Sequence, residues 1–289
     1  MRRKMIALVL LLGTASCLLL FGTKGSSEDK KSNFTDYQVI SHAMGGIREQ
    51  AYTNSYEAFI ANYEKGNRVF EVDLLLTSDE KLVARHEWTK SMTEQLGQQD
   101  ELPEERQAMQ LSYSEFKQSK ILGSYDPLDW EDILDLLQDY PDMYIVTDTK
   151  DENMKLILSK LVNAVQNRDP ALMNQIVLQI YDQPMLQTVH EIYPFKQIIY
   201  TLYATKDTDA EVVDFVKANS IPVVTIPEQR VTQSFISDLN KAGVTTYVNT
   251  INDENEVSKY RRMGVNGVYS DFLTEEEVKS PSWTTRLGL

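Results

Sequence analysis

Two acidic side chains on one predicted strand are the first candidates for chemistry. In the segment Phe70-Glu71-Val72-Asp73 the carboxylates are two residues apart, so Glu71 and Asp73 project from the same face of an otherwise apolar strand. Asp148 and Lys150 repeat this spacing at the end of another predicted strand. Three carboxylates from adjacent parallel strands form a site for a hard divalent ion, Mg²⁺ or Ca²⁺, and Lys150 adds a positive charge. The pattern indicates a metal site whose ligand is an anion such as a phosphate.

Two histidines lie at comparable places in the predicted fold. His42 ends the first predicted strand and is followed by Gly45 and Gly46, which allow a backbone or a ligand to approach closely. His86 ends a hairpin that extends the second predicted strand. Together with the acids and the lysine, the two imidazoles supply what metal-assisted cleavage of a phosphodiester requires, namely charge neutralisation, a base and an acid. Gln179, at the end of the fourth predicted strand, is a candidate for substrate contact.

The elements that must position these side chains alternate regularly along the chain. From Tyr37 to about Pro281 there is no second linker, which favours one domain. Eight β-rich runs alternate with amphipathic helical stretches, a pattern typical of an α/β protein with a (β/α)8 TIM barrel; the alternative is an open, doubly wound sheet. The predicted strands are 38–42, 68–76, 143–150, 175–181, 197–203, 222–226, 245–250 and 267–270. All the candidate residues then fall at the carboxyl ends of strands, where barrels keep their sites.

One stretch interrupts this rhythm after the second predicted strand. Residues 81–87 follow a turn-like segment and are interpreted as a hairpin extension. Residues 88–127 are polar, rich in Gln and Glu, and lack a strand signal, so they are predicted to form an inserted flap over one end of the barrel. The predicted organisation is therefore an N-terminal segment and linker at 1–36, followed by the barrel at 37–289.

Composition excludes several classes of protein. The 289 residues include 29 Lys plus Arg and 43 Asp plus Glu, a net charge of −14. A general nucleic-acid binder needs the opposite balance, because neutralising phosphates supplies most of its affinity. The single cysteine, Cys17, excludes an intramolecular disulfide and a Cys-based zinc site. With three histidines in the whole chain, a multi-His metal site would have to draw on very few residues.

The N-terminus reads as an export signal. Arg2, Arg3 and Lys4 precede an uninterrupted apolar run over residues 5–22. As a helix this run would extend roughly 27 Å, close to the thickness of the hydrocarbon layer. Because no clear cleavage site follows, an uncleaved membrane anchor is favoured over a cleaved signal peptide. Basic residues stay in the cytoplasm, so the folded part is expected outside it.

The ordered motifs of the chain resemble those of the glycerophosphodiester phosphodiesterase family, which belongs to the phospholipase C-like phosphodiesterase superfamily. The resemblance implies a TIM barrel that hydrolyses a glycerophosphodiester with the help of a divalent ion. It also implies that Glu71, Asp73 and Asp148 bind the metal, that His42 is the general base and His86 the general acid, and that Lys150 contacts the phosphate. The segments that carry it are Ile40-Ser41-His42, Thr53-Asn54-Ser55-Tyr56-Glu57-Ala58-Phe59, Phe70-Glu71-Val72-Asp73-Leu74-Leu75-Leu76-Thr77-Ser78-Asp79, Leu82-Val83-Ala84-Arg85-His86-Glu87, Asp148-Thr149-Lys150, Thr250-Ile251-Asn252 and Gly267-Val268-Tyr269-Ser270-Asp271.

The chain departs from the family pattern at three positions. The arginine that usually follows the first histidine is Ala43 here, so phosphate binding falls to Lys150, to Arg85 or to the metal. The third acidic ligand is the shorter Asp148 in place of a glutamate, and Asn249 replaces a tryptophan. These departures concern the identity of the substrate more than the type of reaction.

The expected activity is therefore cleavage of a small or lipid-derived phosphodiester. The attacking group is either water or a neighbouring substrate hydroxyl, and the departing alcohol takes a proton from His86. Two other functions remain open, a phospholipase C-like cleavage of a lipid or cell-envelope diester and a non-catalytic, anchored domain that binds phosphodiesters.

Overall fold

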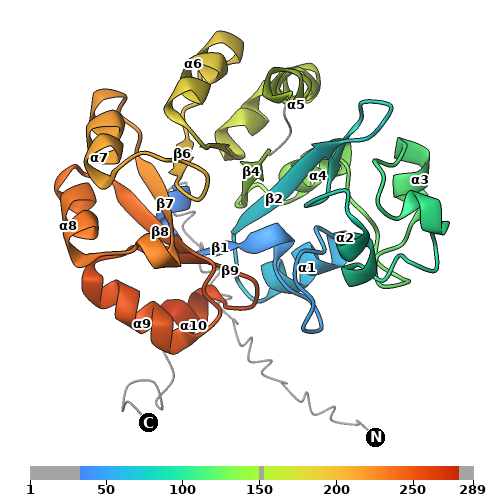
Figure 1. Cartoon of the computed structure of the whole chain (residues 1–289), viewed down its shortest axis with the longest axis horizontal. Helices are drawn as coiled ribbons and strands as arrows, with labels where there is room; N and C mark the ends of the chain where they lie inside the picture. The colour runs from blue at the N-terminus through green and yellow to red at the C-terminus, as the bar shows by residue number, and fades with distance from the viewer. Residues whose placement is uncertain (1–32, 150–152, 280–289) are drawn as a thin grey trace, which may run out of the picture. The chain divides into compact units, whose positions relative to one another are not determined.

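Eight parallel strands close into a barrel in the computed structural model, which describes residues 33–149 and 153–279. Around the barrel the order is β1, β2, β4, β5, β6, β7, β8 and β9, and β9 pairs with β1 to complete the ring (Figure 1). The strands are β1 (Val39–Ser41), β2 (Val69–Leu76), β4 (Tyr144–Asp148), β5 (Ile176–Ile180), β6 (Ile198–Thr201), β7 (Val223–Pro227), β8 (Thr245–Asn249) and β9 (Gly267–Ser270). The predicted barrel is confirmed, and the open sheet is excluded.

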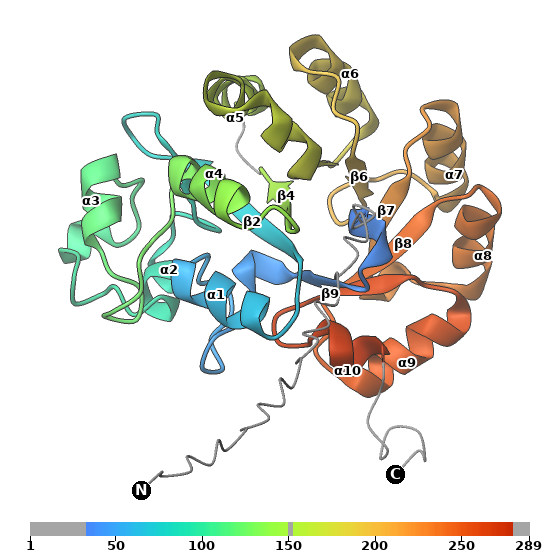
Figure 2. The same ribbon diagram turned by 180° about the vertical axis from the view of Figure 1, so that it is seen from behind.

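Helices surround this barrel, as the views from both sides show (Figures 1 and 2). They are α1 (Tyr56–Glu64), α4 (Trp130–Asp139), α5 (Met154–Arg168), α6 (Gln183–Ile192), α7 (Asp209–Ala218), α8 (Gln233–Lys241), α9 (Glu254–Met263) and α10 (Glu275–Lys279). None of the helices within the described ranges is both long and apolar enough to cross a membrane. The expected signal or anchor segment, residues 5–22, lies outside the described residues.

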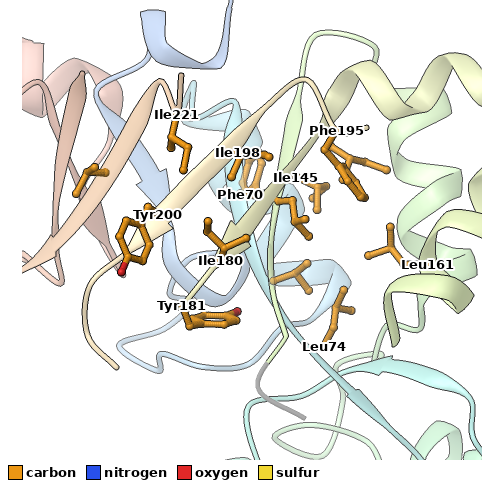
Figure 3. Close-up of a cluster of buried hydrophobic side chains, with 14 of the residues drawn as sticks. Phe70, Leu74, Ile145, Leu161, Ile180, Tyr181, Phe195, Ile198, Tyr200 and Ile221 are labelled. Atoms are coloured by element: carbon orange, nitrogen blue, oxygen red, sulfur yellow. The ribbon is translucent and has the colours of Figure 1, made fainter. Parts of the chain in front are cut away.

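Side chains of the strands form two apolar layers because successive residues point to opposite faces. One layer packs outward against the helices, and Figure 3 shows part of it, including Phe70, Ile145 and Ile180. The other layer fills the inside of the barrel with one buried side chain from each strand. Its members are Ile40, Val69, Val146, Val177, Ile199, Val223, Tyr247 and Tyr269.

A ring of polar residues follows the inner apolar layer toward the carboxyl ends of the strands. Each member stands two residues after an inner apolar residue, so the same alternation brings it to the barrel mouth. The ring consists of His42, Glu71, Asp148, Gln179, Thr201, Thr225, Asn249 and Asp271. The barrel thus collects polar side chains from distant parts of the sequence at one end.

The interruption after β2 is a packed substructure. Strand β3 (Leu82–Ala84) pairs antiparallel with the end of β2, which confirms the hairpin. Residues 88–127, called the insert below, contain the short helices α2 (Lys90–Gln95) and α3 (Tyr113–Gln118). Apolar side chains of the insert form a cluster of their own, onto which Ile47 and Tyr52 from the loop after β1 pack. The buried members of this cluster are Met92, Leu96, Ile121 and Tyr125.

Candidate active site

A cavity of about 180 Å³ opens at the polar end of the barrel. It brings together five of the residues singled out from the sequence, namely His42, His86, Glu71, Asp148 and Gln179. The complete lining is His42, Tyr52, Glu71, His86, Asp148, Gln179, Thr201, Tyr203, Thr225, Asn249, Thr250 and Tyr269. Larger hollows, of about 310 to 450 Å³, are lined by none of these five residues. The smaller cavity is therefore the candidate site.

Three carboxylates meet beside this cavity, and two of them, Glu71 and Asp148, line it. Strands β2 and β4 pair in parallel with Asp73 opposite Asp148, and Glu71 stands two residues earlier on the same face of β2. One carboxylate oxygen from each residue lies within 4.8 Å of the other two. All three side chains are buried, with exposed fractions of 1%, 2% and 7% for Glu71, Asp73 and Asp148. This grouping could hold a metal ion.

The state of Glu71 supports that assignment. Burial and the charge of Asp73 raise the pKa of the Glu71 carboxyl well above its usual value. Its Oε1 atom is buried and has no hydrogen-bond partner within the described part of the chain, while Oε2 accepts from the backbone N–H of Ala43 at 2.7 Å. Buried carboxylates so close together are unfavourable unless a cation compensates them. The donor set, made only of carboxylate oxygens, fits a hard divalent ion.

Neighbouring groups hold the other two carboxylates. The amide of Asn54 donates to Asp73 Oδ2 at 2.9 Å, and its oxygen accepts from the Asp73 backbone N–H at 3.2 Å. The hydroxyl of Tyr181 donates to Asp148 Oδ1 and accepts from the backbone N–H of Thr149 at 2.6 Å. Burial and the charge of Asp148 raise the pKa of Tyr181 well above its usual value, so this phenol remains a donor. Such partners fix the orientation of ligand groups before an ion binds.

His42 is oriented by a carboxylate from the other end of the chain. Its Nδ1 lies 2.8 Å from Asp271 Oδ1, and Asn252 donates to the second oxygen of Asp271 at 2.7 Å. Because a carboxylate only accepts, Nδ1 carries the proton, and Nε2 lies 4.0 Å from Glu71 Oε2. Burial alone would lower the pKa of His42, but the hydrogen bond to Asp271 and the charges of Glu71 and Asp73 raise it to about 9.

The aromatic ring of Tyr52 contacts both histidines. Its centroid lies 4.7 Å from that of His42 and 4.9 Å from that of His86, and it is close to perpendicular to both rings. The centres of the two imidazoles are therefore less than about 10 Å apart. Both imidazoles line the same cavity.

The other two residues predicted to contact the substrate are Lys150 and Arg85. Lys150 lies outside the described residues. Arg85 does not reach the cavity, in contrast to the prediction from sequence. Neighbouring residues of an extended chain point to opposite sides, so the geometry that turns His86 into the cavity turns Arg85 away from it. The Arg85 side chain is only 2% exposed and is bound by the insert.

Comparison with known proteins identifies the family. A model of the glycerophosphoryl diester phosphodiesterase family matches residues 45–275, well over half of the chain. The chain belongs to this family. It is therefore a phosphodiesterase. A comparison with curated proteins found no match.

Solved structures of glycerophosphodiester phosphodiesterases share the barrel at low sequence identity. One from Thermotoga maritima is 20% identical with a TM-score of 0.61, covering 81% of this chain and 94% of its own. One from Parabacteroides distasonis is 17% identical with a TM-score of 0.64, covering 84% and 94%. A phosphodiesterase from Oleispira antarctica, solved with the product sn-glycerol-3-phosphate, is 16% identical with a TM-score of 0.63, covering 84% and 95%.

The structure adds residues to the candidate site that the sequence analysis did not single out. Asp271, Thr201 and Thr225 obey the same spacing rule as the predicted residues, since each follows an inner apolar residue by two positions. That rule could have found them. Asn54 and Tyr52 lie in the loop after β1 at positive φ angles of 46° and 63°, and no periodic pattern marks them.

Proposed function

We propose that this phosphodiesterase hydrolyses a glycerophosphodiester in the cavity at the barrel mouth, with Mg²⁺ or Ca²⁺ held by Glu71, Asp73 and Asp148. The single observation that carries the proposal is that Glu71 and Asp148, which group with Asp73, line one small cavity together with two imidazoles less than about 10 Å apart. The product seen in the Oleispira antarctica enzyme supports a glycerol phosphate product here.

The ion would neutralise charge on the phosphate and polarise its phosphorus–oxygen bonds when bound. The residues of the chain prepare its site by holding each ligand group in place. Asn54 orients Asp73, Tyr181 orients Asp148, and the backbone of residue 43 orients Glu71. An arginine at position 43 is therefore not needed for the geometry of the carboxylates, because the N–H that Ala43 provides is available from any residue except proline.

We assign His42 as the base. With its proton held on Nδ1 by Asp271, its Nε2 can accept a proton from the attacking hydroxyl. This hydroxyl belongs either to water or to a neighbouring carbon of the substrate. In the first case a phosphorus–oxygen bond forms to water as the bond to the departing oxygen breaks. In the second case the substrate hydroxyl displaces the departing oxygen and a cyclic phosphate forms, which water then opens to the glycerol phosphate.

We assign His86, which also contacts Tyr52, as the acid. Protonated, it donates to the alcohol oxygen as the bond to phosphorus breaks, so the alcohol leaves neutral.

Gln179, which accepts from the Tyr269 hydroxyl at 3.1 Å, lies in the cavity and is our candidate for contact with the substrate. Among the lining residues that the structure describes there is no lysine or arginine. We therefore keep the sequence-based assignment of Lys150 to the phosphate.

The test is a panel of glycerophosphodiesters, including glycerophosphocholine and glycerophosphoethanolamine, assayed with added Mg²⁺ or Ca²⁺ and with chelator. We expect release of the alcohol, loss of activity in chelator and recovery on adding the ion. His42→Ala and His86→Ala should each reduce turnover about 10²-fold to 10⁴-fold. Near-normal rates in both variants would contradict the mechanism, and activity indifferent to chelation would contradict the metal.

The same panel separates the two alternative functions. Binding of the diesters without turnover would favour a non-catalytic domain, and cleavage of bilayer lipid alone would favour a phospholipase C-like enzyme. We further propose, from the N-terminal sequence, that the barrel lies outside the cytoplasm. If residues 5–22 are retained they anchor it in the membrane, and if they are cleaved the barrel is released. Fractionation of the full chain, tagged at its C-terminus, tests this location.

A further inference from the structure

Arg85 is a buried cation that donates hydrogen bonds to uncharged polar groups of the chain. Its Nε donates to the backbone oxygen of Glu87 at 2.8 Å. Its Nη1 donates to Gln98 Oε1 at 2.8 Å, and its Nη2 donates to Thr93 Oγ1 at 3.1 Å. The guanidinium carbon also lies 4.9 Å from the centre of the Trp88 ring. Each of the three guanidinium nitrogens is therefore engaged within the insert and the segment that leads into it.

The partners of Arg85 are fixed in turn by the backbone of the insert. Gln98 donates to the oxygen of Ser119 at 2.8 Å, and the Thr93 hydroxyl donates to the oxygen of Gln107 at 2.7 Å. These two contacts tie α2 and the turn after it to more distant parts of the insert. Arg85 thus lies at the centre of a network that crosses the insert.

Hydrogen bonds also hold the two residues that flank His86 in the chain, Arg85 and Glu87. The backbone N–H of Arg85 donates to the oxygen of Asp73 at 2.9 Å, which attaches this residue to the strand that carries two metal-site acids. Its side chain holds the oxygen of Glu87. The residues on both sides of His86 are therefore anchored, one to β2 and the other through Arg85 to the insert. The backbone that carries the imidazole has little freedom to move.

We propose that Arg85 is a positioning residue, through which the insert holds His86 where it can protonate the departing alcohol. This inference rests on the proposed function, because it needs His86 to be the acid. The insert then contributes to catalysis as a rigid support of the acid. A planar guanidinium suits this task, since its fork of donors bonds three oxygens in fixed directions, which the point-like ammonium of lysine does not.

The test compares two substrates that differ in their need for an acid. Glycerophosphocholine releases an alcohol that must be protonated, whereas bis(4-nitrophenyl) phosphate releases a phenolate that leaves without a proton. Arg85→Lys should lower kcat on glycerophosphocholine by about 10-fold or more with KM nearly unchanged, and lower it by less than about 3-fold on the nitrophenyl diester. Thr93→Val, which keeps the arginine and removes one of its acceptors, should give a smaller fall with the same asymmetry.

The controls separate positioning from general destabilisation. Arg106→Met breaks an ion pair with Glu115 in the same insert, of 2.8 Å, and should leave kcat on both substrates unchanged. Equal losses on both substrates in Arg85→Lys and Thr93→Val, or no loss in either, would overturn the inference. If Arg85→Lys does not fold, Thr93→Val decides alone. His86→Ala tests the proposed function separately: if it keeps full activity on glycerophosphocholine, the assignment of the acid fails, and not only that of Arg85.

Discussion

His42 and Asp271 are joined by a hydrogen bond of 2.8 Å, although they are 229 positions apart in the sequence. One follows the first strand of the barrel and the other follows the last, so the bond forms only because β1 and β9 pair and close the ring. Closure of the barrel therefore does more than bury the core. It sets the tautomer of the histidine that we assign as the base.

Asp271→Asn should weaken catalysis through His42. Of the contributions that raise the pKa of His42 to about 9, the hydrogen bond to Asp271 is the largest, so removing that charge lowers the pKa. A base acts only when unprotonated, so activity rises as pH rises through its pKa, and the acidic limb of the kcat/KM profile should shift to lower pH. At the optimum we expect a loss of about 10-fold to 100-fold, less than for His42→Ala. A pH–rate profile identical to that of the wild type would refute this role.

Asn54→Ala should reduce affinity for the ion more than it reduces turnover. The amide of Asn54 bonds both the carboxylate and the backbone N–H of Asp73, so its loss frees a metal ligand to rotate. We expect the dissociation constant for Mg²⁺, measured by calorimetry, to rise about 10-fold to 100-fold. With saturating ion, kcat should recover to within a few fold of the wild type.

Asn54→Gly is the matched control for that variant. Asn54 has a φ angle of 46°, a conformation that strains alanine and suits glycine. If the amide matters, both variants lose affinity for the ion. If only the alanine variant does, backbone strain is the cause and the amide has no role.

Much of the barrel could be predicted because one local rule repeats in it. Each strand alternates between an outward side chain and an inward one, and the last inward position before the loop is polar. Glu71, Asp73 and Asp148 were found by this spacing, and it also accounts for Gln179. The hairpin that leads to His86 was recognisable from its turn. Positions set by strand periodicity need no knowledge of the rest of the fold.

The remaining features depend on contacts that no local pattern encodes. The contact of Tyr52 with two imidazoles depends on a loop with positive φ angles and on packing against the insert. The insert looked like a polar flap because its few apolar side chains are widely spaced, yet these pair across it into a small core. Arg85 is predicted to bind phosphate because the arginine that usually follows the first histidine is replaced by Ala43, and the contacts of Arg85 with Thr93 and Gln98 could not be foreseen.

Gly267→Ala should destabilise the closure of the barrel. A Cβ at Gly267, on β9, would lie 2.4 Å from the backbone oxygen of Gln38 and 2.6 Å from a ring carbon of Tyr247. The backbone where β9 meets β1 cannot shift easily, because the oxygen of Gln38 also accepts a hydrogen bond from the backbone N–H of Val268. We expect the free energy of unfolding in urea to fall by about 3 kcal/mol.

Gly243→Ala is the control for Gly267→Ala. A Cβ at Gly243 meets nothing within 4 Å, but its φ angle of +77° strains any other residue. We expect a loss of about 1–2 kcal/mol from that strain alone. If Gly267→Ala is no less stable than Gly243→Ala, the strands β1 and β9 can move apart without loss of stability.

Glu71→Gln should show how much the buried charge of Glu71 destabilises the ion-free protein, and whether that charge is needed to bind the ion. Burial and Asp73 raise the pKa of Glu71, so its ionised form destabilises the ion-free protein as pH rises through that pKa. Glutamine keeps the shape and an acceptor for the Ala43 N–H without the charge. In chelator near pH 8 we therefore expect the melting temperature of the variant to equal or exceed that of the wild type.

Added Mg²⁺ should reverse this order. The wild type gains stability by mass action as the ion binds, and the gain should grow from pH 5.5 to pH 8 because protons compete with the ion for the carboxylates. The Glu71→Gln variant should show almost no gain and almost no activity. Glu275→Gln alters another buried carboxylate, which accepts from the backbone N–H of Val39 and is no part of the cavity lining, so this variant should respond to the ion as the wild type does. A full Mg²⁺ response in Glu71→Gln would mean that the ion binds elsewhere, and the three carboxylates would then lose their assigned role.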